Sequence, residues 1–204
     1  MIGIINYGMG NLMSVYNAVD YLGFDAEVFD SPNEIDKYDK IILPGVGTYQ
    51  MCFDSLRDSG FVDVLNKCVL IDKKPILGIC VGMQIMSTTG FENGKHSGLN
   101  WFDSEVVKIE PGIDELKVPH VGWNNVKFDS NNILFNKIKQ DVDLYFVHSY
   151  HLKCSNAENR LAWTEYGQEV TAAIYRDNIW GVQFHPEKSQ DHGLQILNNF
   201  IDLA

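Results

Sequence analysis

The sequence predicts an α/β protein with a mixed, mostly parallel central sheet flanked by helices. In the first half, short and continuously apolar runs alternate with segments of helical periodicity. That order is typical of parallel strands that are buried on both faces. After about residue 100, strand-like segments follow one another with few helical intervals, which predicts added antiparallel strands. We expect residues 1–204 to form a single domain, because this length suits one core.

The first half is expected to repeat the order of strand, loop and helix. Strands end in glycine-containing loops, and the first helix has an apolar face that ends at Gly23. Such loops gather at the carboxyl ends of parallel strands, where open α/β sheets place their sites. The expected strands are 1–7, 25–30, 40–44 and 76–79, and the expected helical segments are 12–22, 49–56, 61–71 and 83–86.

The second half is expected to extend the same sheet. An amphipathic helix with apolar residues at 194, 197, 200 and 201 closes the chain and should pack back on the core. The stretch 129–140, rich in Asn and Lys, is the expected surface excursion. The strand-like segments are 105–109, 118–128, 144–152, 160–166, 171–175 and 179–184.

Composition excludes several classes of function. The net charge of −11 and the lack of a Lys/Arg run argue against a nucleic-acid surface. No signal peptide and no apolar run of membrane-spanning length is present, so we expect a cytoplasmic protein without a membrane partner. The four cysteines form no C-x-x-C pair, which suggests neither a zinc site nor a disulfide framework. We expect no metal and no cofactor.

The segment Pro75-Ile-Leu-Gly-Ile-Cys-Val-Gly-Met-Gln84 organises the rest of the chain. It runs from an apolar strand through Gly-x-Cys-x-Gly into residues that favour helix. This is the cysteine form of a nucleophile elbow, a sharp turn whose flanking glycines avoid collisions. A sulfur at a helix N-terminus lies in a positive field that favours the reactive thiolate. Cys80 is therefore a candidate nucleophile; the alternative is a buried cysteine in a glycine-containing turn.

A cysteine nucleophile needs a base, and His185 is the candidate among six histidines. Trp180-Gly-Val-Gln-Phe-His-Pro-Glu187 delivers this histidine at the end of a buried strand, with Glu187 two residues later across a proline. A carboxylate bonded to the far ring nitrogen would select the tautomer that deprotonates the thiol. The alternative is a structural histidine at a strand end.

The same geometry suggests two donors to an oxyanion. The amide N–H of Val81 follows the nucleophile, as in other nucleophile elbows. The loop Pro44-Gly-Val-Gly47 ends a strand that is expected beside the elbow strand, so the amides at Val46 and Gly47 can supply a second donor. Its glycines would let the peptide turn either way. The alternative is a plain strand-to-helix turn.

Together, Gly78-Ile-Cys-Val-Gly-Met-Gln84 and His185-Pro-Glu187 resemble the class I glutamine amidotransferase domain, which has a flavodoxin-like fold. The resemblance covers essentially the whole chain, and it implies that Cys80, His185 and Glu187 form a Cys-His-Glu triad that releases ammonia from glutamine. Finer motifs are similar to the glutaminase subunit of imidazole glycerol phosphate synthase: Asn6-Tyr-Gly-Met-Gly-Asn-Leu12, Pro44-Gly-Val-Gly47, Pro119-His-Val-Gly-Trp-Asn124, Tyr145-Phe-Val-His-Ser-Tyr150 and His185-Pro-Glu-Lys-Ser189.

The resemblance implies further roles for matching residues. Some would bind glutamine: Gln84 at its amino-acid end, Glu92 at its ammonium group, and the backbone amides of Ser149 and Tyr150 at its carboxylate. Others would lie toward a partner subunit: Asn11, Trp123 and Lys188. Simple alternatives are a core position for Trp123, a solvated charge for Lys188 and a hydrogen-bonded strand histidine for His148.

The implied partner is a (β/α)₈-barrel cyclase that forms a heterodimer with this chain and uses its ammonia in histidine biosynthesis. A triad domain that fills 204 residues leaves no room for an ammonia-using domain, so a separate synthase is expected. Two valines, Val81 and Val121, and the stretch 98–102 depart from the family pattern. A paralogue that supplies ammonia to a sugar-modifying, amidine-forming synthase therefore stays an alternative, as do a Cys-His hydrolase of another amide and a non-catalytic regulatory module.

Overall fold

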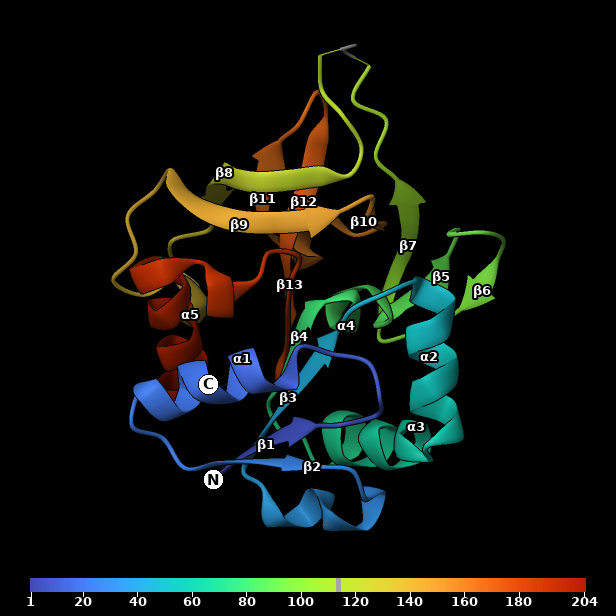
Figure 1. Ribbon diagram of the computed structural model, residues 1–204, viewed down its shortest axis with the longest axis vertical. Helices are drawn as coiled ribbons and strands as arrows, with labels where there is room; N and C mark the ends of the chain where they lie inside the picture. The colour runs from blue at the N-terminus through green and yellow to red at the C-terminus, as the bar shows by residue number, and fades with distance from the viewer. Residues whose placement is uncertain (113–114) are drawn as a thin grey trace.

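The computed structural model, which describes residues 1–112 and 115–204, confirms the mixed α/β architecture (Figure 1). Within these residues the strands form a nine-stranded sheet and a smaller four-stranded sheet. From one edge to the other, the large sheet contains β2 (Ala26–Phe29), β1 (Ile2–Ile5), β3 (Lys40–Gly45), β4 (Ile76–Cys80), β13 (Ile179–Val182), β12 (Glu169–Arg176), β11 (Arg160–Glu165), β8 (His120–Phe128) and β9 (Val142–His148).

The large sheet joins a parallel part to an antiparallel part. Strands β2, β1, β3, β4 and β13 pair in parallel, and β13, β12, β11, β8 and β9 pair antiparallel. The chain therefore returns from the antiparallel part to place β13 beside β4. This return brings the end of the elbow strand next to a segment that lies about a hundred residues further along the chain.

The four-stranded sheet corrects one prediction. Strands β10 (Tyr150–Cys154), β7 (Phe102–Lys108), β5 (Ser87–Gly90) and β6 (His96–Ser97) form it, so the segments 105–109 and 144–152 do not simply extend the main sheet. The predicted strand 144–152 is divided at Ser149 into β9 and β10. Buried side chains continue on both sides of this point, so the apolar pattern alone carries no sign of the change of sheet.

Helices cover both faces of the parallel part (Figure 1). On one face lie α1 (Leu12–Tyr21) and α5 (Gln190–Leu203), which contact each other, and on the other face lie α2 (Tyr49–Asp58) and α3 (Phe61–Leu65). The predicted helix 61–71 continues from α3 as a π-helical segment, η2 (Asn66–Ile71). The elbow helix α4 (Val81–Gln84) begins and ends two residues earlier than the expected segment 83–86, with Ile85 as its C-cap ahead of β5. In the described part of the chain, none of the helices is long and apolar enough to cross a bilayer.

The predicted surface excursion at 129–140 is only partly on the surface. It contains the short 3₁₀ turn η3 (Ile133–Phe135), in which Leu134 and Phe135 are buried. The Phe135 ring stacks on Phe128 with centroids 4.1 Å apart. Asn199 of α5 donates to the Leu134 carbonyl at 3.0 Å. The polar composition of the segment gave no sign that Leu134 and Phe135 are buried. These two residues hold the segment against the sheet and α5. The remaining short turns are η1 (Pro32–Lys37), η4 (Ala157–Asn159) and η5 (Pro186–Lys188).

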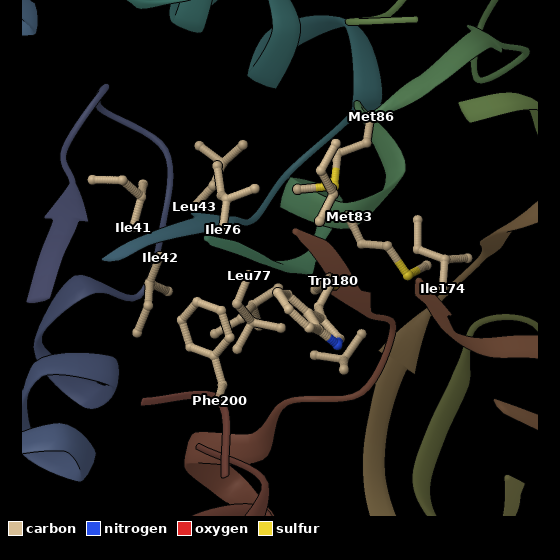
Figure 2. Close-up of a cluster of buried hydrophobic side chains, with 14 of the residues drawn as sticks. Ile41, Ile42, Leu43, Ile76, Leu77, Met83, Met86, Ile174, Trp180 and Phe200 are labelled. Carbon is tan, nitrogen blue, oxygen red and sulfur yellow. The ribbon is translucent and has the colours of Figure 1, made fainter. Parts of the chain in front are cut away.

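The core lies on both faces of the central strands. Figure 2 shows Ile41 and Leu43 of β3 pointing to one side of the sheet, together with Met83 and Met86. On the other side, Ile42 and Leu77 point toward Trp180 and Phe200, whose ring centroids are 5.9 Å apart. Because both faces are covered, alternate residues need no polar side chains. This explains why the parallel strands are continuously apolar in sequence. The packed strands also hold the loops at their carboxyl ends in fixed positions.

Candidate active site

Cys80 stands at the junction of β4 and α4 in a backbone conformation that non-glycine residues rarely adopt. Its φ is 56° and its ψ is −111°, and it is only 4% exposed. Such strain costs on the order of 1–3 kcal/mol and is typical of active sites. The turn is also sterically tight: a Cβ on Gly82 would lie 2.0 Å from the backbone oxygen of Leu43 on β3. The elbow predicted from Gly-x-Cys-x-Gly is therefore the observed geometry, and the glycine is required by the close approach of β3.

His185 and Glu187 follow β13 and form a buried pair. His185 Nδ1 donates to Glu187 Oε1 at 2.8 Å, and the Glu187 side chain is 1% exposed. That bond leaves His185 Nε2, which is buried and has no hydrogen-bond partner among residues 1–112 and 115–204. Since β13 pairs with β4 and both His185 and Cys80 line the same cavity, Nε2 is the ring nitrogen available to the thiol.

The surroundings favour the protonated form of His185. Burial lowers the pKa of its imidazole, but the interactions of the ring with Cys80 and Glu187 outweigh this and raise the pKa to about 9. An imidazolium is the state that forms when the ring takes the proton of the thiol. The pair is thus arranged to accept that proton and hold it.

Ser189, which the sequence analysis did not single out, fixes the loop that carries the pair. Its hydroxyl donates to the His185 carbonyl at 2.7 Å and accepts from the Tyr145 amide at 3.0 Å. The His185 amide in turn donates to the Tyr145 carbonyl at 2.9 Å. The loop is therefore tied to β9 on both sides. In the sequence, the only sign of this role was a serine close to the His-Pro-Glu motif. Serine is common at the start of helices as a capping residue, so its presence there did not point to a role in the site.

A cavity of about 290 Å³ opens in front of Cys80. Its volume is at the small end for ligand sites, which suits a molecule of amino-acid size. The structure brings ten sequence-predicted residues together in its wall. The lining consists of Val46, Gly47, Cys80, Val81, Gln84, Glu92, Pro119, Val147, His148, Ser149, Tyr150, His185 and Lys188.

The loop after β3 lies beside the nucleophile and is held in a defined orientation. Gly45 is in register with Cys80, and the loop carbonyls are fixed from behind: Tyr7 Oη donates to Pro44 O at 2.7 Å, and Cys52 Sγ to Val46 O at 3.3 Å. Gly47 has a φ of +105°, which favours glycine. The loop also leads into α2 as an ordinary strand-to-helix turn would. Both sequence interpretations are therefore compatible with its geometry.

Gln84 and Glu92 both line the cavity, and each is held by hydrogen bonds. Gln84 Nε2 donates to the Tyr150 carbonyl and to Gln183 Oε1, both at 2.9 Å. Glu92 Oε2 accepts from the Tyr49 amide at 2.7 Å, so this carboxylate also satisfies the first turn of α2. Tyr150 starts β10, directly after the chain leaves the main sheet at Ser149. The amides expected to bind a carboxylate therefore lie at the change of sheet.

A chain of hydrogen bonds that begins at the cavity wall with His148 was not predicted. His148 Nδ1 donates to Tyr150 O at 2.8 Å, which leaves His148 Nε2 to accept from His120 Nδ1 at 3.0 Å. His120 Nε2 then accepts from Asn124 Nδ2 at 3.2 Å. Burial lowers the pKa of His120 to about 4 and is the main cause that lowers the pKa of His148 to about 3. Both rings are therefore neutral, and His148 is the hydrogen-bonded strand histidine of the simpler interpretation.

The three predicted partner residues lie on three segments of the chain: Trp123 on β8, Lys188 on η5, and Asn11 directly before α1. Trp123 is 48% exposed, so a core position is wrong for it. Its ring is edge-on to Tyr145, with centroids 5.9 Å apart, and Lys188 Nζ lies 5.9 Å from the centroid of the same tyrosine ring. Asn11 lies apart from the row that Trp123, Tyr145 and Lys188 form. It directly precedes α1, and α1 packs against η5, the turn that carries Lys188. Val121 and Val147 are also exposed, and together with Trp123 they make the edge of the cavity apolar.

The described residues contain no group of three or more His, Cys, Asp or Glu side chains that could hold a metal ion. The site contains a cysteine, a histidine–glutamate pair and backbone amides around them. These groups suit nucleophilic attack on a carbonyl carbon, followed by proton transfer through the imidazole.

Comparison with known proteins shows the family to which the chain belongs. Residues 3–203 match the family model described as glutamine amidotransferase class-I. Imidazole glycerol phosphate synthase subunit HisH 2 of Methanococcus maripaludis is 44% identical over 204 residues, with all of both chains covered. Subunit HisH of Moorella thermoacetica is 45% identical over 203 residues, which cover 100% of this chain and 95% of that one.

Solved structures show the same fold at low identity. The PurLQS structure from Thermotoga maritima aligns with a TM-score of 0.77 at 17% identity, covering 98% of this chain and 96% of the other. A glutamine amidotransferase from the same organism aligns with a TM-score of 0.64 at 15% identity, covering 98% of this chain and 82% of the other. The chain belongs to the class-I glutamine amidotransferase family and is similar over its whole length to HisH subunits of imidazole glycerol phosphate synthase.

Proposed function

We propose that this chain is the glutaminase subunit of an imidazole glycerol phosphate synthase. It hydrolyses glutamine to glutamate and delivers the ammonia to a cyclase subunit in histidine biosynthesis. The observation that carries the proposal is the strained Cys80 beside the buried His185–Glu187 pair, at one end of a cavity of amino-acid size. The full-length similarity to HisH subunits supports the pathway. The match to residues 3–203 supports a single amidotransferase domain.

The first half-reaction forms a thioester. His185 Nε2 takes the proton of Cys80, and the sulfur attacks the side-chain carbonyl carbon of glutamine. The amide of Val81 and the loop at Val46 and Gly47 donate to the resulting oxyanion. The carbon–nitrogen bond then breaks, and ammonia leaves with the proton from His185. Removal of one oxyanion donor typically costs about 10²–10³ in rate.

The second half-reaction releases glutamate. The neutral imidazole of His185 takes a proton from water, and the hydroxide attacks the thioester carbon. The carbon–sulfur bond breaks, and the sulfur regains the proton. Glu187 keeps Nδ1 of His185 protonated in both steps, so that Nε2 is always the exchanging atom. The pKa of His185 is raised to about 9, which means that the site stabilises the imidazolium formed in each step.

The cavity wall offers groups for the rest of the substrate. In this proposal the amides of Ser149 and Tyr150 receive the glutamine carboxylate, Gln84 contacts its amino-acid end, and Glu92 neutralises its ammonium. All four residues line the cavity with Cys80. The distance of each group from the nucleophile would then select a side chain of the length of glutamine.

A partner subunit should cap this site. Val147 and Lys188 line the cavity and are exposed, and Trp123 stands next to them in the row formed with Tyr145. Exposed aromatic and valine side chains beside a cavity are typical of a protein interface. Ammonia released into water would be protonated and would lose its nucleophilicity. We therefore assign Trp123, Lys188 and Asn11 to the contact with a (β/α)₈-barrel cyclase, which receives the ammonia.

The partner should also activate the site. The carbonyls of Pro44 and Val46 are held by Tyr7 and Cys52, which fixes the orientation of the loop peptides in the isolated chain. A partner that turns one of these peptides would complete the oxyanion site. We expect low glutaminase activity from the isolated chain, and a fully active isolated chain that ignores its partner would contradict this expectation.

The test is a pull-down from native extract with this chain as bait, followed by glutaminase and synthase assays on the complex. Recovery of the barrel cyclase, and formation of imidazole glycerol phosphate with wild-type chain but not with Cys80→Ala, would support the proposal. Recovery of a sugar-modifying synthase would keep the glutaminase chemistry and reject the histidine pathway. If no complex releases glutamate under any condition, the glutaminase proposal fails.

A further inference from the structure

Gln183 is a buried polar side chain whose role the preceding mechanism leaves open. It directly follows β13, two residues before His185, and it is fully buried. Val182 is in parallel register with Ile79, so the next residue along each strand brings Gln183 beside Cys80. The backbone N–H of Gln183 donates to the Ala172 carbonyl at 2.8 Å. The backbone at this position is therefore fixed by the sheet, which leaves only the side chain to be explained.

Both ends of the Gln183 amide contact residues of the site. Its Oε1 accepts from Gln84 Nε2 at 2.9 Å, and its Nε2 lies 3.7 Å from Cys80 Sγ, within hydrogen-bond range for sulfur. One side chain thus bridges the nucleophile and a residue in the cavity wall. A buried glutamine with both polar ends engaged is costly to replace, because each lost bond leaves an unsatisfied group.

The direction of these bonds follows from a backbone carbonyl. Tyr150 O can only accept, so the Gln84 atom at 2.9 Å must be its amide nitrogen. The other hydrogen on that nitrogen points to Gln183, whose facing atom must then be the oxygen. Consequently the Gln183 nitrogen is the atom that faces Cys80. The amide therefore presents an N–H group, and not a carbonyl lone pair, to the sulfur.

This orientation has two consequences for the site. An N–H directed at sulfur favours the thiolate over the thiol, because hydrogen bonding to the charged form stabilises it. In addition, both hydrogens on Gln84 Nε2 are used within the protein, so Gln84 Oε1 is the polar atom left for a ligand. That atom accepts hydrogen bonds, which matches an ammonium or amide donor on the substrate.

We propose that Gln183 is a further catalytic residue, which donates an N–H to the Cys80 thiolate and sets Gln84 so that its carbonyl oxygen faces the substrate. The role of Gln84 toward substrate rests on the proposed glutaminase function, whereas the donation to sulfur does not. The two parts are therefore tested with different readouts.

The first readout is the pH profile of Cys80 alkylation by iodoacetamide, followed by mass spectrometry of the Cys80 peptide. Gln183→Met keeps the length of the side chain and removes the donor. We expect its profile to shift to higher pH by about one unit, with about a tenfold slower reaction near neutral pH. Gln183→Glu keeps an acceptor for Gln84 but places negative charge beside the sulfur, so its shift should be at least as large.

The matched control is Gln140→Met. Gln140 also donates to a carbonyl, that of Phe128 at 2.8 Å, but it lies outside the cavity wall. Because Gln140 is exposed, this variant controls for the glutamine-to-methionine exchange outside the site, and the proposal predicts a wild-type alkylation profile for it. If Gln183→Met does not fold, Gln183→Glu decides. An unshifted profile in a folded Gln183 variant would overturn the proposal.

The second readout is steady-state glutaminase kinetics of the complex with its partner. Loss of Gln183 should lower kcat through the sulfur and raise KM through Gln84, for a combined fall in kcat/KM of about a hundredfold, ten from each effect. If alkylation shifts but no complex of wild-type chain releases glutamate, the proposed function fails and the donation to sulfur stands. If glutamate is released and kcat and KM do not change in Gln183→Met, the proposal for Gln183 fails alone.

Discussion

Acid should destabilise the fold through the two neutral histidines His120 and His148, the second of which lines the cavity. Burial lowers the pKa of His120 to about 4 and is the main cause of the lowered pKa of His148, about 3. Histidines in an unfolded chain have a pKa of about 6.5. Between about pH 6.5 and pH 4 the unfolded chain therefore binds protons that the folded chain does not bind. Stability consequently falls as the pH falls through this window.

The size of the effect follows from these pKa values. A buried histidine loses about 1.4 kcal/mol of stability per pH unit below 6.5, so a change from pH 7 to pH 5 costs about 2 kcal/mol. His120 and His148 share a hydrogen bond of 3.0 Å and do not titrate independently. Both rings are still largely neutral in the folded chain at pH 5, so for the pair we expect a loss of about 4 kcal/mol. His151, whose pKa burial lowers to about 4, adds to the total.

The assay is urea unfolding, followed by tryptophan fluorescence, at pH 7 and pH 5. His148→Gln removes one titrating group, so its loss of stability between these pH values should be smaller than that of wild type by about 2 kcal/mol. The control is His192→Gln, because His192 is exposed on α5 and should leave the wild-type loss unchanged. Equal losses in His148→Gln and wild type would refute the assignment of acid sensitivity to this pair.

Three further predictions concern the elbow, the histidine–glutamate pair and the rim. Glu187→Gln should lower kcat of the complex by about 10³–10⁴, because the imidazolium loses its counter-charge and its tautomer is no longer selected; a fall of less than tenfold in glutamate release would contradict this. Gly82→Ala should destabilise the fold by at least about 4 kcal/mol in urea, because its Cβ would lie 2.0 Å from a backbone oxygen of β3. Gly122→Ala, with φ +126° and open space around it, should cost about 1–2 kcal/mol, and equal costs would refute the steric account. Trp123→Ala should weaken partner binding at least about thirtyfold in calorimetry with little change in urea stability, and unchanged affinity would remove Trp123 from the interface.

The sequence contained enough to predict the fold class and the meeting of the two site motifs. Continuous apolar runs before Cys80 and His185 indicated buried strands, and each functional side chain followed directly at a strand end. Placement at the same edge of a parallel sheet then brought the two residues together. The register of β13 on β4 supplied the remaining precision, and register is set by packing that no local pattern reveals.

The four-stranded sheet and the hydrogen bonds at the cavity wall could not be predicted in the same way. The chain leaves the main sheet at Ser149 without a glycine or proline at that position, so the segment 144–152 looked like one strand. His120 and Gln183 lie within strand-like stretches, where a single polar residue has many possible partners. Only the fold shows that they face His148 and Cys80.

The measurement that tests the central claim most directly is covalent labelling with a glutamine analogue that carries a diazoketone in place of the carboxamide. The complex with the partner subunit would be incubated with the analogue, with and without excess glutamine, and the site of labelling read by peptide mass spectrometry. We predict a single adduct on Cys80, slowed by glutamine and abolished in His185→Ala. Labelling of Cys52, Cys68 or Cys154 instead, or labelling of Cys80 that glutamine does not slow, would contradict a glutamine-specific nucleophile at the end of β4.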